Sequence, residues 1–573
     1  MSTNSMCPVY DEYSPIVPDG LIEHSRIMAP EVYNIADKVY LAYGYGLGSP
    51  AMIVGDDGII IIDPNECEVK SRRVLEAFRK ITDKPVVAVI YTHFHADHVF
   101  GVRAFASPED VAAGRIQIIS HETLPYFMAL QSSSGIGTIL GLRNSYTFGQ
   151  ELPVAEDGRI NNGIGPDNIR GKDACGYIAP TLTFRDTLDI TIAGVRLHLL
   201  WVPSECEDEI AVWLPDYRIL HTAEVVQGEC FPNLHTIRGT RYRNPRTWYK
   251  SLDKLRSFGA EYMVPAHGRP TYGKEAVEEV LRSYRDGIQY VYDQTIRLMN
   301  RGYTARELAH MVALPEHLAR HRWLGEYYGA VYAHVQEIYQ GELGFFDGDP
   351  TTLQPTPPVE SARRHLALMG GRDKVLAEAR KAGEAGDWHW AAELTTYIIR
   401  VDNDDMDARL LKAQAMRQIG YTQTAIHIRN WYLCAALELE GKAPGAGFSY
   451  GGYPAVTAGF PARGLLDGMS MQLLGDETLD LHLSMAFEVD GERCALEIRR
   501  GVAEFHETPS GREDVAVRLA KPDLDLVFCR RTSFEKCLEE GRLQIVAGSR
   551  EDALLFFSKF EWPTAAAIRL TIR

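Results

Sequence analysis

Three histidines and an aspartate stand close together in the segment YTHFHADHVFG at 91–101. His93, His95, Asp97 and His98 form the pattern H-x-H-x-D-H. Imidazole and carboxylate side chains together suit zinc or a similar divalent metal. On a loop that leaves a strand, residues two apart can converge on one ion, and residues on the first turn of a following helix can bind a second ion nearby. The pattern therefore predicts part of a metal site.

Further ligands must come from later in the chain. Glu205, Glu224 and His267 each follow a short apolar segment of strand character. In an α/β sheet the loops after such strands gather the functional side chains. The segment SECEDE offers three glutamates, so Glu207 and Glu209 compete with Glu205 for the same role.

The elements that position these residues follow from the apolar patterning of the first 275 residues. The segment KPVVAVIYTH is a buried strand that ends where the histidines begin, and an Asp-Asp-Gly turn predicts a hairpin within 39–63. Helices are predicted at 69–80 and 246–258, and further strands at 188–202, 209–214, 218–222 and 262–267. This alternation of strands and helices predicts an α/β domain.

The rest of the chain changes pattern twice. It turns helical after Lys274, passes a proline-rich linker at 348–358, and continues as helix pairs of tetratricopeptide type up to about residue 441. A glycine- and proline-rich connector follows, and apolar residues then alternate from Leu479 to Phe487 before an Asp-Gly hairpin turn. We therefore expect a catalytic domain at 1–347, an all-α domain at 348–441 and an α+β domain at 442–573.

Composition limits the partners and the compartment. The formal net charge of −17 argues against nucleic acid as the main partner, but it leaves room for an anionic substrate in a local cationic pocket. No apolar run approaches the roughly 18 residues of a membrane helix. The N-terminus lacks the pattern of a secretory signal, and nine scattered cysteines form no CxxC pair. We expect a cytoplasmic protein with reduced thiols and no transmembrane segment.

Three features together resemble the metallo-β-lactamase superfamily: Asp63 after a hairpin strand, the H-x-H-x-D-H loop, and AHGRP at 266–270. Glutamates at 205 and 224, where most of that superfamily has a histidine and an aspartate, together with NLHTIRG at 233–239, are similar to the alkylsulfatase branch, the type III alkyl sulfatases. The resemblance implies an α/β fold, the metallo-β-lactamase αβ/βα sandwich. An all-α segment that mediates homodimerisation and a C-terminal α+β sterol-carrier-like domain would follow.

The resemblance also implies a dinuclear zinc hydrolase that cleaves alkyl sulfate esters to alcohol and inorganic sulfate through a metal-activated water. Glu224 would contact both zinc ions, and Glu224 and Asp97 would have catalytic roles. The implied ligands are His93, His95 and Glu205 for one ion, and Asp97, His98 and His267 for the other.

Substrate recognition is assigned by the same resemblance. Asn233 and Arg238 would bind the sulfate group, because an arginine fork pairs with two sulfate oxygens and asparagine adds a neutral donor. We expect the nearby Arg241 and Arg243 to form surface ion pairs instead. The segment 124–149 mixes aromatic, methionine and glycine residues, and is either the mouth of an alkyl-binding tunnel or ordinary core.

One position departs from the branch. Tyr332 and Ala333 stand where the branch has serine and histidine, and His334 stands one residue further on. The branch histidine helps to protonate the leaving group or to hold the sulfate. Either His334 replaces it in that catalytic role, or the role is unfilled.

Two other functions remain open. A metallo-β-lactamase-fold hydrolase could act on a different ester or a phosphoester with the same metal site. A lipid-binding protein with an inactive metal site would use the C-terminal cavity instead. Cys206 and Cys230 lie near the predicted ligands in sequence, but buried free cysteines are common and we assign them no catalytic role.

Overall fold

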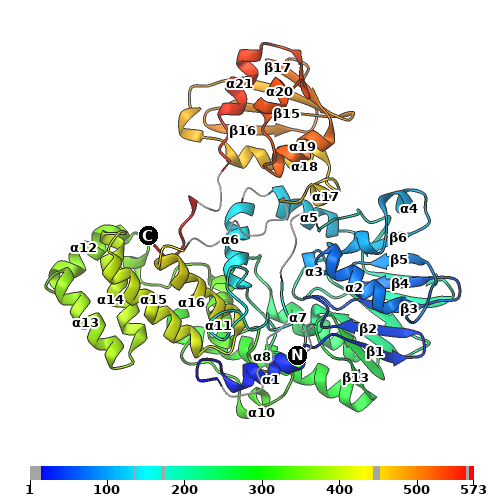
Figure 1. Cartoon of the computed structure of the whole chain (residues 1–573), viewed down its shortest axis with the longest axis horizontal. Helices are drawn as coiled ribbons and strands as arrows, with labels where there is room; N and C mark the ends of the chain where they lie inside the picture. The colour runs from blue at the N-terminus through cyan, green and yellow to red at the C-terminus, as the bar shows by residue number, and fades with distance from the viewer. Residues whose placement is uncertain (1–13, 134–135, 169–173, 443–451, 563–566, 573) are drawn as a thin grey trace.

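The computed structural model describes residues 14–133, 136–168, 174–442, 452–562 and 567–572. Its N-terminal part contains two β-sheets that lie face to face (Figure 1). The seven-stranded sheet has the order β1-β2-β3-β4-β5-β6-β7, and the six-stranded sheet has the order β13-β12-β11-β10-β9-β8. The first sheet comprises β1 (Glu31–Ala36), β2 (Val39–Tyr43), β3 (Ala51–Val54), β4 (Ile59–Ile62), β5 (Val86–Ile90), β6 (Gln117–His121) and β7 (Leu182–Phe184). The second comprises β8 (Thr187–Ile192), β9 (Val195–Trp201), β10 (Ile210–Leu214), β11 (Ile219–Ala223), β12 (Tyr262–Pro265) and β13 (Thr271–Tyr272).

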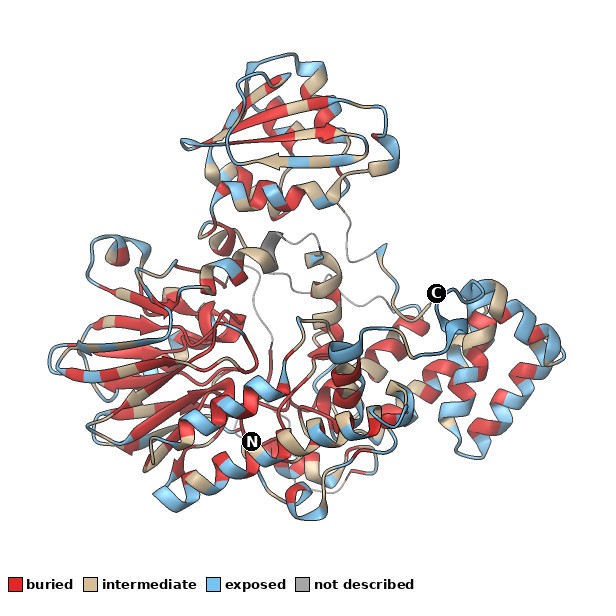
Figure 2. Cartoon of the chain, turned by 180° about the vertical axis from the view of Figure 1, so that it is seen from behind, coloured by how far each residue is buried: buried red, intermediate tan, exposed pale blue. Residues whose placement is uncertain are grey.

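Apolar side chains from both sheets form the core between them. Ile60 and Ile62 of the first sheet belong to one buried cluster with Leu199 and Val212 of the second. Helix α2 (Glu68–Phe78) packs on the outer face of the first sheet, and helices α7 (Pro245–Arg256) and α8 (Lys274–Met299) pack on the outer face of the second. Because each β-strand in the middle is apolar on both sides, the strands are coloured mostly as buried in Figure 2. This arrangement confirms the predicted αβ/βα sandwich.

Strand direction explains how distant segments meet at one edge. β4, β5 and β6 are parallel, and β11 is parallel to β12, so the loops after these strands leave from common edges. The predicted strand at 188–202 is in fact two strands, β8 and β9, joined by a tight turn. Ala193 and Gly194 both have positive φ there, as a hairpin turn of the primed type needs.

In its described residues, the same part of the chain contains ten further helices, most of them short. They are α1 (Asp19–Arg26), α3 (Ala96–Val99), η1 (Val102–Ala104), α4 (Pro108–Ala112), α5 (Leu124–Ser133), α6 (Gly137–Thr147), η2 (Glu224–Val226), α9 (Ala305–Leu308), α10 (Glu316–Ala319) and α11 (Val331–Leu343). In this part of the chain, the elements that were not predicted from the sequence include β1, β6, β7, β13, α1 and the helices from α4 to α6.

The helical segment stacks antiparallel neighbours beside α6 (Figure 1). It comprises α12 (Pro358–Leu368), α13 (Arg372–Glu384), α14 (Trp388–Val401), α15 (Met406–Tyr421) and α16 (Ile426–Leu439). The predicted linker at 348–358 contains only the short helix η3 (Pro350–Thr352) before α12 begins. The last helix, α16, is the one that packs on α6.

The C-terminal part is a separate five-stranded sheet with helices, drawn at the top of Figure 1. Its strands have the order β16-β15-β14-β17-β18, of which only β14 and β15 were predicted. The predicted alternating strand begins at Leu483, because Leu479 follows the turn η6 (Gly475–Glu477) and is exposed. The elements are α17 (Pro454–Thr457), α18 (Ala462–Met469), η5 (Ser470–Gln472), β14 (Leu483–Val489), β15 (Glu492–Arg499), β16 (Val502–His506), β17 (Val515–Leu519), α19 (Lys521–Phe528), α20 (Phe534–Glu539), β18 (Leu543–Ala547) and α21 (Arg550–Ser558).

Two negative expectations can be compared with the described residues. Among those residues, no helix combines the length and the apolar character that a membrane crossing requires. No disulfide joins any of the eight cysteines in the described ranges, all eight are buried, and Cys7 lies outside these ranges.

Candidate metal centre

The H-x-H-x-D-H segment lies at the carboxyl end of β5. His93 and His95 are on the loop, and Asp97 and His98 are on the short helix α3 that follows. All four side chains are buried. The predicted loop-to-helix geometry is therefore present, and it points the four side chains into the interior.

The structure gathers all seven predicted ligands into two groups. The His95 group contains His93, His95, Glu205 and Cys206, and the His98 group contains Asp97, His98, Glu224 and His267. Within each group, one ligand atom from every residue lies within 4.8 Å of the others.

Cys206 was assigned no role from the sequence. Its Sγ atom lies 3.4 Å from Nε2 of His95. Its position next to Glu205 was the only available sign, and that sign is weak because buried cysteines are common.

Glu224 is at the centre of the His98 group. Its Oε1 atom lies 3.0 Å from Nε2 of His98 and also contacts Nε2 of His267. Oδ2 of Asp97 lies 3.4 Å from the same nitrogen of His98 and 3.5 Å from that of His267. Two imidazoles and two carboxylates thus converge on one small volume.

Outer partners orient three of the four members of this group. Oδ2 of Asp63 lies 2.8 Å from Nδ1 of His98, and Nδ1 of His267 lies 2.6 Å from the carbonyl oxygen of Leu47. Gln227 donates from Nε2 to Oε2 of Glu224 at 2.9 Å. Such partners fix the ring tautomer and present the other nitrogen to a metal.

Backbone strain accompanies this placement. Asp63 has φ 55° and Ala223, immediately before Glu224, has φ 51°. Positive φ costs free energy in a residue other than glycine, and it persists where the surrounding structure enforces it. Both strained residues lie at strand ends beside the metal-binding groups.

The three glutamates of the SECEDE segment have three different surroundings. Glu205 lies in the His95 group, with Oε1 3.0 Å from Nδ1 of His95. Glu209 is buried behind the site, where its Oε1 accepts the backbone N–H of Glu224 at 2.6 Å. The Glu207 side chain is 63% exposed and pairs with Arg241, itself 59% exposed. Of the three, only Glu205 lies among the predicted ligands.

Arg243 corrects an expectation. Arg241 forms the surface pair predicted for it, whereas Arg243 is buried. Nη2 of Arg243 donates to Oε1 of Glu205 at 2.5 Å, and Nη1 donates to the carbonyl oxygen of Asn233 at 2.7 Å. The prediction was wrong for Arg243 because the loop turns this side chain inward under the segment that carries Asn233.

The donor atoms fit divalent cations. Among the residues that the structure describes, Nε2 of His93 and Oε2 of Glu205 are buried without a hydrogen-bond partner. Asp97, Glu205 and Glu224 are three buried carboxylates in one region, which is costly without positive charge nearby. Histidine and carboxylate ligands with open positions are typical of zinc and related metals.

Charge interactions within the site shift several pKa values. Burial would raise the pKa of Asp97, but the neighbouring His98 and His267 hold it well below its usual value. Burial, with His98 and His95 nearby, lowers the pKa of His93 well below normal. A neutral imidazole and an ionised carboxylate are the forms that bind metal.

Asn233 and Arg238 lie on the loop that follows η2. Nδ2 of Asn233 and Nη1 of Arg238 are buried and have no hydrogen-bond partner within the described ranges. The backbone N–H of Asn233 donates to Oε1 of Gln227, the residue that also contacts Glu224. Asn233 is therefore linked through Gln227 to the His98 group, and Arg238 lies on the same loop with its guanidinium carbon 5.5 Å from the centre of the Phe148 ring.

His334 is buried on the first turn of α11. Its ring stacks on Phe231, and neither ring nitrogen has a hydrogen-bond partner in the part of the chain that the structure describes. Burial, together with His235 and Arg243, lowers the pKa of His334 well below its usual value. The lowered pKa favours the neutral imidazole over the protonated form that a general acid needs.

Tyr328 is another buried residue of this region that the sequence did not identify. Burial raises the pKa of its phenol well above normal. Arg238 acts to lower this pKa, and the carboxylates of the site act to raise it.

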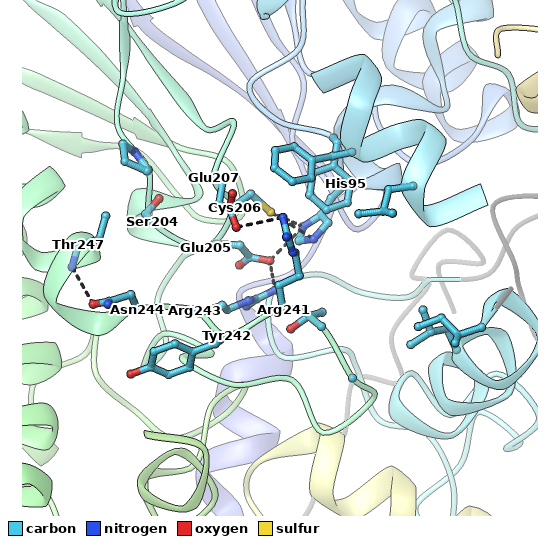
Figure 3. Close-up of a pocket in the computed structure, with 18 residues that line it drawn as sticks. His95, Ser204, Glu205, Cys206, Glu207, Arg241, Tyr242, Arg243, Asn244 and Thr247 are labelled. Carbon is cyan, nitrogen blue, oxygen red and sulfur yellow. Dashed lines mark hydrogen bonds and ion pairs between the residues drawn. The ribbon is translucent and has the colours of Figure 1, made fainter. Parts of the chain in front are cut away.

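An apolar cavity adjoins the His95 group (Figure 3). Its volume is about 540 Å³. The apolar wall comes from Phe94, Phe127, Leu130, Ile136 and Leu140, and the inner end is formed by His95 with Glu205. Four of these apolar residues belong to the predicted segment 124–149. Figure 3 shows Glu205 and Cys206 beside His95. Arg241 and Arg243, two residues apart on one loop, lie close to them.

Comparison with known proteins agrees with this geometry. Residues 44–267 match the family model described as the metallo-beta-lactamase superfamily, and residues 304–442 match the model described as alkyl sulfatase dimerisation. The chain is 46% identical to a linear primary-alkylsulfatase of Pseudomonas sp. (strain ATCC 19151), over 91% of this chain and all of that protein. It is 30% identical to an (R)-specific secondary-alkylsulfatase of Pseudomonas sp., over 90% of this chain and 78% of that protein.

A solved structure is similar over almost the whole chain. The stereoselective inverting sec-alkylsulfatase Pisa1 from Pseudomonas sp. has a TM-score of 0.89 and 27% identity, covering 97% of this chain and 89% of that one. The similarity thus includes the sandwich, the helical segment and the C-terminal sheet. Together with the identity to the primary-alkylsulfatase, it shows that the chain belongs to the alkylsulfatase family of the metallo-β-lactamase superfamily.

Proposed function

We propose that this protein is a dinuclear zinc hydrolase that cleaves alkyl sulfate esters to alcohol and inorganic sulfate. The observation that carries the proposal is the set of buried, unused donors of Asn233 and Arg238 beside the two ligand groups. A site for an uncharged ester would have less need of a cationic donor next to its metals. The 46% identity to a linear primary-alkylsulfatase supports the same substrate class.

The ligands divide between two ions in this proposal. His93, His95 and Glu205 would hold one zinc, Asp97, His98 and His267 would hold the other, and Glu224 would serve both. When bound, such ions supply the Lewis acidity that makes a water molecule nucleophilic at neutral pH. Hydrolysis adds the elements of water across the ester link, and it yields the alcohol and hydrogen sulfate.

The chain's own residues orient the substrate. Arg238 and Asn233 donate to the sulfate oxygens, and charge-assisted bonds of this kind are stronger than neutral ones. His334 adds a neutral N–H, since its lowered pKa keeps the imidazole uncharged at pH 7. Arg243 holds Glu205 and the carbonyl of Asn233, so it links the metal side to the sulfate side.

The cavity beside the His95 group binds the alkyl chain. Its wall of phenylalanine, leucine and isoleucine favours a hydrocarbon, because burying apolar surface stabilises the complex by about 0.8 kcal/mol per methylene. A linear chain that buries several methylene groups should therefore bind more tightly than a methyl group of equal charge.

We also propose that residues 304–442 mediate homodimerisation, as the description of the matching family model indicates. The domain boundaries near residues 347 and 441, and a cytoplasmic location, remain predictions from the sequence.

The direct test combines metal analysis with product analysis. Zinc per chain is measured by inductively coupled plasma mass spectrometry, and sulfate release is measured from short, long and branched alkyl sulfates, with a phosphodiester and a lactam alongside. We expect about two zinc ions per chain and sulfate release that is greatest with the linear medium-length ester.

Two matched variants sharpen the test. Arg238→Gln should raise KM by about tenfold or more, the loss for one hydrogen bond to a charged group, while Arg246→Gln at an exposed position should not. Two metal ions per chain without sulfate release from any alkyl sulfate would favour a hydrolase of another ester or of a phosphoester. Fewer than one metal per chain would favour the lipid-binding alternative.

A further inference from the structure

His427 lies in the helical segment but its side chain is buried against the catalytic part. It is the second residue of α16, and only 2% of it is exposed. Its ring packs edge-on against Tyr328, with ring centres 4.2 Å apart, and against Phe148 at 5.2 Å. Nε2 of His427 is enclosed without a hydrogen-bond partner among the described residues.

The same surroundings contain the proposed sulfate donor. The guanidinium carbon of Arg238 lies 5.5 Å from the centre of the Phe148 ring, so Arg238 and His427 contact one aromatic residue. Burial, with the charges of Arg238 and Arg243, lowers the pKa of His427 well below normal. The imidazole is therefore neutral at pH 7, and it has one N–H to donate.

The backbone around His427 is held firmly. The N–H of Ile426 donates to the carbonyl oxygen of Tyr327 at 2.8 Å. One turn further on, Asn430 donates to the carbonyl oxygen of Thr147 at 3.0 Å, and the indole of Trp431 donates to the Thr147 hydroxyl at 2.9 Å. These bonds fix α16 next to Phe148, so His427 keeps one position relative to Arg238.

A purely structural role leaves the ring nitrogen unexplained. A buried polar atom without a partner costs about 1–3 kcal/mol, and a phenylalanine or leucine would pack between Tyr328 and Phe148 without that cost. Arg238 presents an unused donor beside Phe148, the ring that His427 also contacts, and Asn233 presents another on the same loop as Arg238. Unused donors on neighbouring segments indicate a bound group with several acceptor oxygens.

We propose that His427 donates a neutral N–H to the sulfate group held by Asn233 and Arg238, so that the helical segment contributes a substrate-binding residue. This inference rests on the proposed function, because it assumes a sulfate ester as the ligand. It adds a contact from a segment that the family model describes only as a dimerisation domain.

The test measures binding rather than turnover. Isothermal titration calorimetry on the zinc-loaded full-length protein uses octanesulfonate, whose carbon–sulfur bond is not an ester, and inorganic sulfate. His427→Phe keeps a ring between Tyr328 and Phe148 but removes the donor, and His427→Gln restores an N–H near the position of Nε2. We expect His427→Phe to weaken both anions about tenfold or more, and His427→Gln to recover most of that loss.

Three controls separate the donor from packing. His389→Ala removes an exposed histidine of the same helical segment and should change nothing. Binding of octanol, which has the chain without the anion, should be the same in His427→Phe and the parent protein. His427→Leu serves as a second donorless variant if the phenylalanine lowers the melting temperature or the zinc content.

The outcomes discriminate between the two proposals. If the parent protein binds octanesulfonate and both donorless variants bind it equally well, the role of His427 is wrong and the proposed function stands. If the parent protein with two zinc ions binds neither anion, the proposed function is wrong, and the inference falls with it. Equal weakening of octanol and octanesulfonate would mean that His427 only supports packing.

Discussion

The His98 group and the His95 group are similar in ligand type but differ in how they are supported. Three of the four members of the His98 group have an outer partner: Asp63 for His98, the Leu47 carbonyl for His267 and Gln227 for Glu224. The His95 group has outer partners for two of its four members, Thr92 for His93 and Arg243 for Glu205. It borders the apolar cavity, and within the described residues one side-chain atom each of His93 and Glu205 lacks a hydrogen-bond partner.

This difference indicates a division of labour. A group held on all sides is preorganised and binds its ion tightly, because little ordering remains to be done when the ion arrives. A group that faces a cavity can adjust as substrate enters. We therefore expect the His98 group to retain its metal longer, and the His95 group to be more sensitive to substrate.

The largest effect is expected from Glu224→Gln. Glu224 contacts both histidines of the His98 group, and losing its charge leaves His98 and His267 without their shared partner. Because the residue is a ligand, its loss should exceed the roughly 10- to 100-fold effect of an outer partner on activity. Zinc content and sulfate release are measured together, with the exposed Glu275→Gln as control. Full zinc content with normal activity would contradict a ligand role.

The next effect concerns the outer partner Asp63. Asp63→Asn should weaken zinc in the His98 group about 10- to 100-fold, since an amide orients the His98 ring less strongly than a carboxylate. Release of zinc to a chelator should show a fast and a slow phase in the parent protein, and the variant should accelerate the slow phase. A variant that accelerates only the fast phase would reverse the assignment of the two groups.

Arg243→Gln should separate substrate binding from metal binding. Arg243 holds Glu205 and the carbonyl of Asn233, so its loss should lower kcat/KM about tenfold, the loss for a hydrogen bond to a charged group. Zinc content should stay the same, because all four members of the His95 group remain in this variant. The measurement is steady-state hydrolysis of octyl sulfate at known zinc content. Loss of a zinc ion would show that Arg243 supports the ligand group itself.

The smallest effect is expected from Glu207. Its pair with Arg241 is solvent-exposed, and such pairs contribute about 0–1 kcal/mol. Glu207→Gln should therefore change activity less than about fivefold, whereas Glu205→Gln should lower both zinc content and activity much more. Equal losses in the two variants would mean that the cavity edge reorganises when zinc binds.

The sequence predicted the positions that follow directly from strand endings. His93, Glu205, Glu224 and His267 come just after apolar segments, and parallel strands bring such ends to common edges whatever the intervening loops do. The α/β alternation was predictable from the apolar patterning, whereas the facing sheets were expected only from the resemblance to the superfamily.

Other features depend on how loops turn, which periodicity does not encode. Arg243 lies two residues after Arg241, yet one is buried against Glu205 and the other is exposed. His427 is about 200 residues from the loop it approaches, and its helical pattern predicts only packing. Glu209 has the same side chain as Glu205 but supports a backbone N–H instead. Tertiary contacts decide these cases.

The attachment of α16 to Thr147 has a consequence for the inheritance of the modules. Residues 304–442 match one family model and residues 44–267 match another, as if each were an exchangeable unit. Yet Asn430 and Trp431 both donate hydrogen bonds to Thr147, the residue before Phe148. The guanidinium of Arg238 packs on the Phe148 ring. Substitutions that tune substrate choice can therefore accumulate in the helical segment. Recombination that replaced this segment would alter which esters are recognised as well as which chains assemble.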